Sequence, residues 1–186
     1  MKSRIFICLS LLLFLIFPLQ ASPVQKRDHL TPQEIDLVKE AQILDKRIEV
    51  FIKATERRLM VITGTAAAGT NAKQLKKDAE RWGELPTGSR FELVGDIARI
   101  YDEAITNIDD VSTRDERNPL IPKALRKLAQ SVTSTMEQIK PLRTEAKSEA
   151  DIASLEMLNE DAQSILAAAN KLPPEVDKKA KKNEKK

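Results

Sequence analysis

The sequence predicts an all-α fold, an antiparallel four-helix bundle with a long irregular linker between its first two helices. Apolar residues recur every three or four positions along four segments, which is the spacing of one helix face. Polar N-cap residues precede most of these segments, and glycine or proline follows them. The alternative is a fold of three long helices, of which the last is kinked at Pro141.

The N-terminus has the layout of a secretory signal peptide, residues 1–21. Lys2 and Arg4 precede an apolar run, residues 5–19, which is shorter than the roughly 20 residues of a membrane-spanning helix. We expect cleavage after about Ala21; the alternative is an uncleaved membrane anchor. The sequence therefore predicts an exported protein, either periplasmic or secreted, and residues 22–30 form a flexible lead-in.

The first predicted helix begins with a capping box. Thr31 is the N-cap, Pro32 suits the first helical position, and Glu34 completes the box. The helix is expected to continue without a break until Gly64 ends it. Its apolar seam has the near-heptad spacing of coiled coils and consists of Leu37, Ala41, Leu44, Ile48, Phe51, Thr55, Leu59 and Ile62.

The linker, residues 63–88, is longer than the loops of most helical bundles. We expect a short helix over residues 72–82 within it. Because long loops often carry binding surfaces, we select Trp82, Lys76 and Lys77 as candidate contacts for a partner. Trp82 either fills a gap where the linker folds over the bundle or is an exposed anchor for that partner.

The second predicted helix starts near Ser89, where Glu92 again completes a capping box. Tyr101 lies on its apolar seam, so we expect a buried ring whose hydroxyl reaches a polar edge. The sequence Asn118-Pro119 marks the turn that follows this helix.

The third predicted helix starts within residues 119–122, with a kink at Pro141 and a continuation to about Lys147. Ser148 then resembles the N-cap of a fourth helix. Pro173 and Pro174 close that helix. The sequence therefore predicts a single helical domain over residues 31–176.

The net charge of +3 combines parts of opposite sign. The tail, residues 177–186, contains six lysines, whereas residues 22–176 carry more acidic than basic side chains. A nucleic-acid partner requires a basic face on the folded domain, so we expect no nucleic-acid binding. The tail has almost no apolar residue, so we expect it to be disordered and to offer a contact with a membrane surface.

The residue types argue against an enzyme. The single cysteine, Cys8, lies in the expected signal peptide, and the single histidine, His29, is expected to be solvated. Haem attachment and di-iron sites need cysteine or histidine motifs that are not in the sequence. Residues 64–70 resemble a phosphate loop, but Thr70 stands where the loop needs a lysine. We expect no catalytic, metal or cofactor-binding residue and no cofactor.

Charges of both signs share one face of the first helix. Lys46, Lys53 and Arg57 alternate with Glu49 and Glu56. This pattern favours ion pairs within the helix over a surface that binds phosphate or lipid headgroups.

Two resemblances arise from the helical segments. Residues 36–59, Asp-Leu-Val-Lys-Glu-Ala-Gln-Ile-Leu-Asp-Lys-Arg-Ile-Glu-Val-Phe-Ile-Lys-Ala-Thr-Glu-Arg-Arg-Leu, resemble the opening helix of secreted all-helical proteins from soil-type bacteria that have no assigned function. Residues 30–34, Leu-Thr-Pro-Gln-Glu, are similar to the Leu-Thr-x-x-Gln motif of small periplasmic stress chaperones. Glu34 replaces the glutamine of that motif and helix capping explains the segment, so the chaperone role is not carried over.

These features predict an exported, non-enzymatic helical-bundle protein that acts through protein contacts or self-association in the cell envelope. The first alternative is a protein that binds lipid or a membrane surface through amphipathic helices and the lysine-rich tail. The second alternative is a periplasmic, chaperone-like holdase.

Overall fold

The computed structural model describes residues 27–65 and 72–174. The predicted signal peptide, most of the lead-in, the centre of the linker and the lysine-rich tail lie outside these residues. Every regular element within them is a helix and none is a strand, so the predicted all-α class is confirmed. None of these helices combines the length and the apolar character that a membrane crossing requires.

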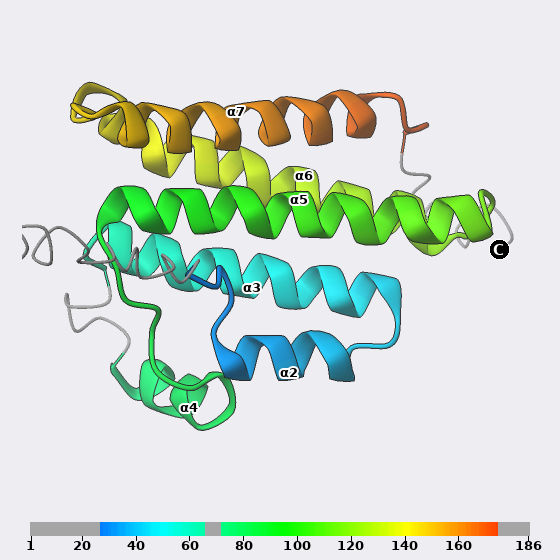
Figure 1. Ribbon diagram of the computed structural model, residues 1–186. Coiled ribbons are helices and arrows are strands. Elements are labelled where there is room, and N and C mark those ends of the chain that lie inside the picture. The colour runs from blue at the N-terminus through cyan, green and yellow to red at the C-terminus, as the bar shows by residue number, and fades with distance from the viewer. Residues whose placement is uncertain (1–26, 66–71, 175–186) are drawn as a thin grey trace, which may run out of the picture.

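The first predicted helix is two helices, so the expectation of one unbroken helix was wrong. α2 spans Pro32–Glu40 and α3 spans Leu44–Ile62. Between them, Ala41 and Ile43 leave the helical conformation, and Arg47 Nε donates to the Ala41 carbonyl at 2.9 Å. Figure 1 shows α2 lying beside α3 after this turn. Leu37 and Leu44 are both buried, but on two helices that pack together.

Three further α-helices complete the core of the fold. α5 spans Arg90–Arg114, α6 spans Leu120–Ile139 and α7 spans Glu149–Asn170. α3 packs against α2, α5 and α6, while α5 and α6 both pack against α7. In Figure 1 the chain reverses direction between α3 and α5, between α5 and α6, and between α6 and α7.

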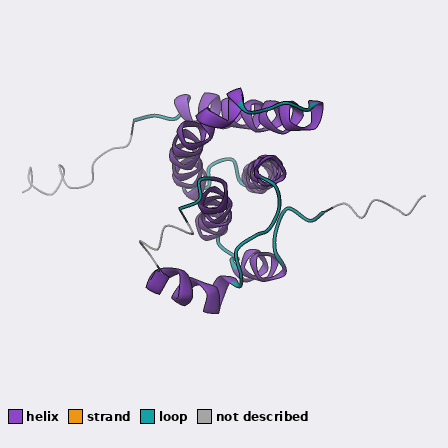
Figure 2. Cartoon of the chain, turned by 90° about the vertical axis from the view of Figure 1, so that its left-hand side faces the viewer, coloured by secondary structure: helices purple, strands orange, loops and turns teal. Residues whose placement is uncertain are grey.

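The predicted short helix is present as α4, Ala72–Trp82. Figures 1 and 2 show α4 at the outer edge of the molecule, apart from the helices that enclose the core. α2 is the helix with which it shares most contacts. The linker therefore holds a helix against the outside of α2 and α3.

Pro141 ends α6 instead of kinking it. Proline lacks the backbone N–H that an α-helix needs, and a 3₁₀ helix, η2, spans Lys140–Thr144. Ser148 then caps α7, because its hydroxyl accepts a hydrogen bond from the backbone N–H of Asp151 at 3.1 Å. α6 and α7 are therefore separate helices, and the alternative of one long kinked helix was wrong.

The core contains side chains from every long helix. Tyr101 is fully buried, and its hydroxyl lies 2.7 Å from Thr135 Oγ1 and 3.3 Å from Ser131 Oγ, which confirms the predicted polar edge. The predicted capping boxes of Thr31 and Ser89 are confirmed as well. Other fully buried core residues include Ile48, Phe51, Leu93, Ile97, Leu128, Leu158 and Ile165.

Candidate binding site beneath α4

Glu34 lies at the centre of four buried charged residues, Glu34, Arg57, Arg58 and Asp96, here called the charge cluster. Its carboxylate accepts hydrogen bonds from Arg57 Nε at 3.1 Å and from Arg58 Nη2 at 2.8 Å. Glu34 Oε2 also accepts from the Thr31 backbone N–H at 2.9 Å, which closes the capping box. Several charge-assisted bonds to one buried carboxylate offset much of the cost of removing these charges from water.

Arg58 fastens the first described residues of the chain to α3. Its Nη2 donates to the backbone carbonyl of His29, and its Nε lies 3.9 Å from Asp96 Oδ2. Arg27 Nη2 donates to the same Asp96 oxygen at 2.7 Å, and Leu30 is buried in the core. Residues 27–30, which were predicted to belong to a flexible lead-in, thus lie against α3 and α5.

Asp96 is the acidic residue of the cluster that α5 contributes. Burial raises the pKa of Asp96, and the nearby guanidinium groups of Arg27, Arg58 and Arg99 oppose this rise. Its Oδ2 has the hydrogen bond from Arg27, whereas its Oδ1 lies 3.6 Å from Arg99 Nη1 and accepts no hydrogen bond. Asp96 therefore serves as a buried anchor for several cations rather than as a free acid.

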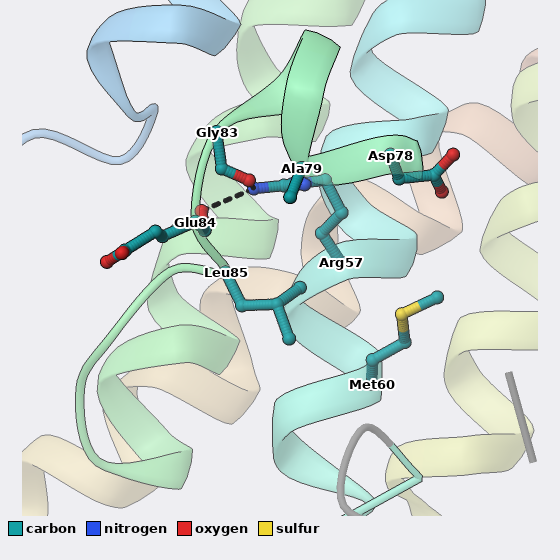
Figure 3. A pocket seen from close by; sticks show the side chains of 7 residues that line it. All are labelled: Arg57, Met60, Asp78, Ala79, Gly83, Glu84 and Leu85. Atoms are coloured by element: carbon teal, nitrogen blue, oxygen red, sulfur yellow. Dashed lines mark hydrogen bonds between the residues drawn. The ribbon is translucent and has the colours of Figure 1, made fainter. Parts of the chain in front are cut away.

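Arg57 extends from α3 towards the C-terminal end of α4. Its Nη2 donates to the carbonyls of Gly83, at 3.2 Å, and of Glu84 (Figure 3). Its guanidinium carbon lies 5.9 Å from the centre of the Trp82 ring, within the range of cation–π attraction. Burial lowers the pKa of Arg57, and the Glu34 carboxylate opposes this change. Arg57 thus binds the backbone carbonyls of the first two residues after α4.

A second cation of α3 fixes the middle of α4. Lys53 Nζ lies 3.2 Å from Asp78 Oδ2, one helical turn before Trp82. Gly83, with a φ of +69°, follows Trp82 and ends the helix in the left-handed conformation that glycine adopts without strain. Lys53 and Arg57, which contact α4, and Leu37, Val50 and Met60, which line the spaces beside it, are together called the α4 seat below.

The contact between α4 and its seat leaves space on both sides. On one side is a cavity of about 240 Å³, lined by the residues labelled in Figure 3: Arg57, Met60, Asp78, Ala79, Gly83, Glu84 and Leu85. On the other is a groove of about 380 Å³, lined by Leu37, Glu40, Ala41, Lys46, Glu49, Val50, Arg81 and Trp82. The groove has an apolar floor and a rim of both charges, which suits a protein segment better than a small metabolite.

The described residues that line the cavity and the groove supply several kinds of contact. They combine cations, carbonyls, an aromatic ring and apolar side chains, and none of these described lining residues is a serine, threonine, cysteine or histidine. Within residues 27–65 and 72–174, no three or more acidic, histidine or cysteine side chains gather in a way that fits a metal ion.

The candidate contacts of the linker separate into two groups. Trp82 is half-buried against Arg57 and lines the groove, and its two possible roles, as a side chain that fills a gap and as an anchor for a partner, stay predictions. Lys76 and Lys77 are exposed on α4 and line neither the cavity nor the groove. Their role as contacts for a partner stays a prediction.

Two sequence interpretations need correction. His29 is not simply solvated, because its Nε2 lies 2.9 Å from Glu103 Oε2 and its ring is largely covered. The mixed charges of α3 do pair within the helix at Lys46–Glu49 and Lys53–Glu56. Arg57 instead turns inward to Glu34.

The charge cluster was missed because Glu34 already had an explanation as a capping residue. A signal was nevertheless present in the sequence. Arg58 lies four residues after Ala54 and four before Ile62, so it occupies a core position of α3. Asp96 likewise lies four residues before the buried Ile100, so it occupies a core position of α5. A charge at a core position indicates a buried partner of opposite sign.

Comparison with known proteins adds no relative, since the chain matches no protein-family model, no curated protein sequence and no solved structure.

Proposed function

We propose that the chain is an exported, non-enzymatic protein of the cell envelope that acts through protein contacts. In this proposal α3, α5, α6 and α7 form an antiparallel four-helix bundle that serves as a rigid support. The groove between α2, α3 and α4 is the contact surface. Exposed charged side chains on its rim give orientation, and the apolar floor gives affinity.

The observation that carries the proposal is the composition of this groove. Leu37 and Val50 form a largely buried apolar floor, half-buried Trp82 adds an aromatic ring, and the neighbouring Arg81 and Lys46 are exposed. Ile43, in the turn beside the groove, leaves 55% of its surface exposed, more than any other large apolar residue of the described chain. Protein interfaces usually have an apolar centre with an aromatic anchor, and a polar rim surrounds that centre.

The test is site-specific photo-crosslinking of the full chain in its native envelope. A photoreactive amino acid at Arg81, on the groove rim, is expected to give an adduct of defined mass with a protein. The same amino acid at Ile152, which is 45% exposed on α7, is the matched control and is expected to give much less of that adduct. An Ala41→Arg substitution, which fills the groove, should remove the adduct.

Three results would contradict the proposal. These are equal adducts from Arg81 and Ile152, an adduct that persists after Ala41→Arg, and the absence of any protein adduct from Arg81. Flotation of the same chain with anionic vesicles tests the membrane alternative, because binding that salt abolishes would assign the contact to lipid headgroups.

A further inference from the structure

We propose that the α4 seat is a docking site for an amphipathic helix of a partner protein, and that α4 is the internal occupant which this helix displaces. The inference rests on the proposed function, since it specifies the kind of protein segment that binds. In this proposal the groove is one part of a longer binding site, and α4 occupies the rest of that site.

The attachment of α4 is the first argument. The cavity and the groove show that, among the described residues of α4, Asp78, Ala79, Arg81 and Trp82 border unfilled space. Unfilled space forfeits dispersion contacts, and elements with few buried contacts open at the lowest free-energy cost. α4 also lies outside the ring of core helices in Figure 2, so its departure leaves the long helices in contact with one another.

The polar contacts of the seat define what it recognises. Arg57 binds the carbonyls of the two residues that follow α4, so it recognises the backbone immediately after a helix placed there. The same guanidinium faces the Trp82 ring. Lys53 binds the carboxylate of Asp78, which lies four residues before that ring. The partner segment therefore carries an acidic residue, an aromatic residue four positions later, and a helix end immediately after it.

Arg57 is held in place for this task by residues that α4 does not supply. Its Nε is bound to Glu34 of α2, and Glu34 is bound in turn by Arg58. A side chain fixed by buried partners loses little conformational entropy when it binds. The seat is thus expected to keep its geometry when α4 leaves.

Competition by α4 itself sets the expected affinities. A covalently linked occupant acts at an effective concentration of about millimolar, so it masks the seat from a free helix in the native chain. A chain whose own α4 has lost its anchor exposes the seat. Binding of a free helix should therefore be much tighter to such a chain than to the native one.

The experiment uses a synthetic peptide with the sequence of residues 72–88, labelled with a fluorophore for anisotropy. It is titrated with the native full chain and with the Trp82→Ala chain, whose seat residues on α2 and α3 are unchanged. We expect saturable binding that is at least tenfold tighter to Trp82→Ala. Because Trp82 is the only tryptophan of the sequence, emission from the peptide's own tryptophan then reports its burial without background.

Two control peptides test the recognition chemistry. A peptide with Trp82→Ala is expected to bind at least tenfold more weakly, and one with Asp78→Lys, which places a cation against Lys53, at least fivefold more weakly. If the Trp82→Ala chain loses helical circular dichroism, an Asp78→Lys chain replaces it. Loss of helix in both chains would overturn the proposal, because α4 would then be part of the core.

Other outcomes also overturn the docking proposal. These are the absence of saturation at millimolar peptide, equal binding of native and control peptides, and dimers of the chain in light scattering, which would show that α4 is exchanged between two copies. The photo-crosslink from Arg81 is scored separately. An adduct there without peptide binding would keep the proposed function and reject only displacement of α4.

Discussion

The Glu34 side chain links three parts of the site, namely α2, the end of α4 and residues 27–30. It caps α2 through Thr31, and it binds Arg57, which holds the end of α4, as well as Arg58, which holds residues 27–30. It is fully buried. Removal of one partner from a buried ionic group leaves the others without compensation, which costs far more than loss of an exposed pair.

Replacement Glu34→Gln is therefore expected to lower the free energy of unfolding by about 3 kcal/mol, because two buried guanidinium groups lose their shared anion. Urea unfolding followed by circular dichroism measures this change. Glu49→Gln is the matched control. Glu49 is part-exposed and pairs with Lys46 and Lys127, so its loss should cost less than about 1 kcal/mol. Equal losses for the two variants would contradict a special role of Glu34.

Single residues show where sequence reasoning succeeds and where it stops. Tyr101 was placed correctly in the core with its hydroxyl at a polar edge, because an aromatic residue on an apolar seam has few other arrangements. Glu34 and Arg57 were assigned only local roles. Glu34 and Arg57 bind each other but lie 23 residues apart in the chain. No local sequence pattern links residues at that separation, and only the fold brings them together.

At the scale of elements, the starts of most helices were predictable, but the break that begins α3 was not. Ser89 and Ser148 identify the beginnings of α5 and α7, because a polar cap followed by an acidic residue has a direct local cause. The break at Ala41–Ile43 contains neither glycine nor proline. The break depends on the packing of α2 along α3. This tertiary contact overrides the local preference of a continuous apolar seam for one unbroken helix.

The loop after α4 allows a prediction at the same scale. Gly88 has a φ of +147°, and a β-carbon there would lie 2.0 Å from Arg27 Nη1. A Gly88→Ala substitution should therefore strain the backbone and also displace Arg27 from the buried carboxylate of Asp96. We expect a loss of about 2–3 kcal/mol of unfolding free energy, measured by urea unfolding.

Gly64→Ala is the control for this prediction. Gly64 has a φ of +71°, and a β-carbon there would meet no atom within 4 Å, so only backbone strain applies. Its cost should be about 1 kcal/mol. If both glycine variants lose the same stability, contact with Arg27 contributes nothing measurable.

For the whole molecule, the seam between α5 and α7 carries uncompensated negative charge. Asp161 Oδ2 on α7 is buried without a hydrogen-bond partner. Burial, followed by the nearby carboxylates of Asp102 and Glu160, raises the pKa of Asp161 to about 6. α7 itself contains no lysine or arginine. The pairing of the two helices is therefore weakened when Asp161 is ionised.

This seam predicts a pH dependence whose sign is set by the raised pKa. The folded protein holds the Asp161 proton more tightly than the unfolded chain, so its contribution to stability is fully present below about pH 4 and is lost as pH rises to about 6. Asp161→Asn should stabilise the protein by about 1 kcal/mol at pH 7, after allowance for solvent screening. The gain should disappear at pH 4, which thermal unfolding at both pH values measures.

Asp109→Asn is the control for this pH effect, since Asp109 is exposed on α5. It should change stability little at either pH. A gain from Asp161→Asn that is equal at pH 4 and pH 7 would show that shape, not charge, limits the packing of α7.

The contacts of the first described residues also bear on the order in which the molecule assembles. Arg27 and His29 find their side-chain partners 69 and 74 residues later, on α5. A ribosome makes these residues long before it makes Asp96 or Glu103, so the side chains of Arg27 and His29 lack these partners while α2 and α3 emerge, although the His29 carbonyl can already bind Arg58 of α3. Contacts between residues so far apart close only after much of the chain is available. The side-chain contacts of Arg27 and His29 are thus completed only after α5 has been made.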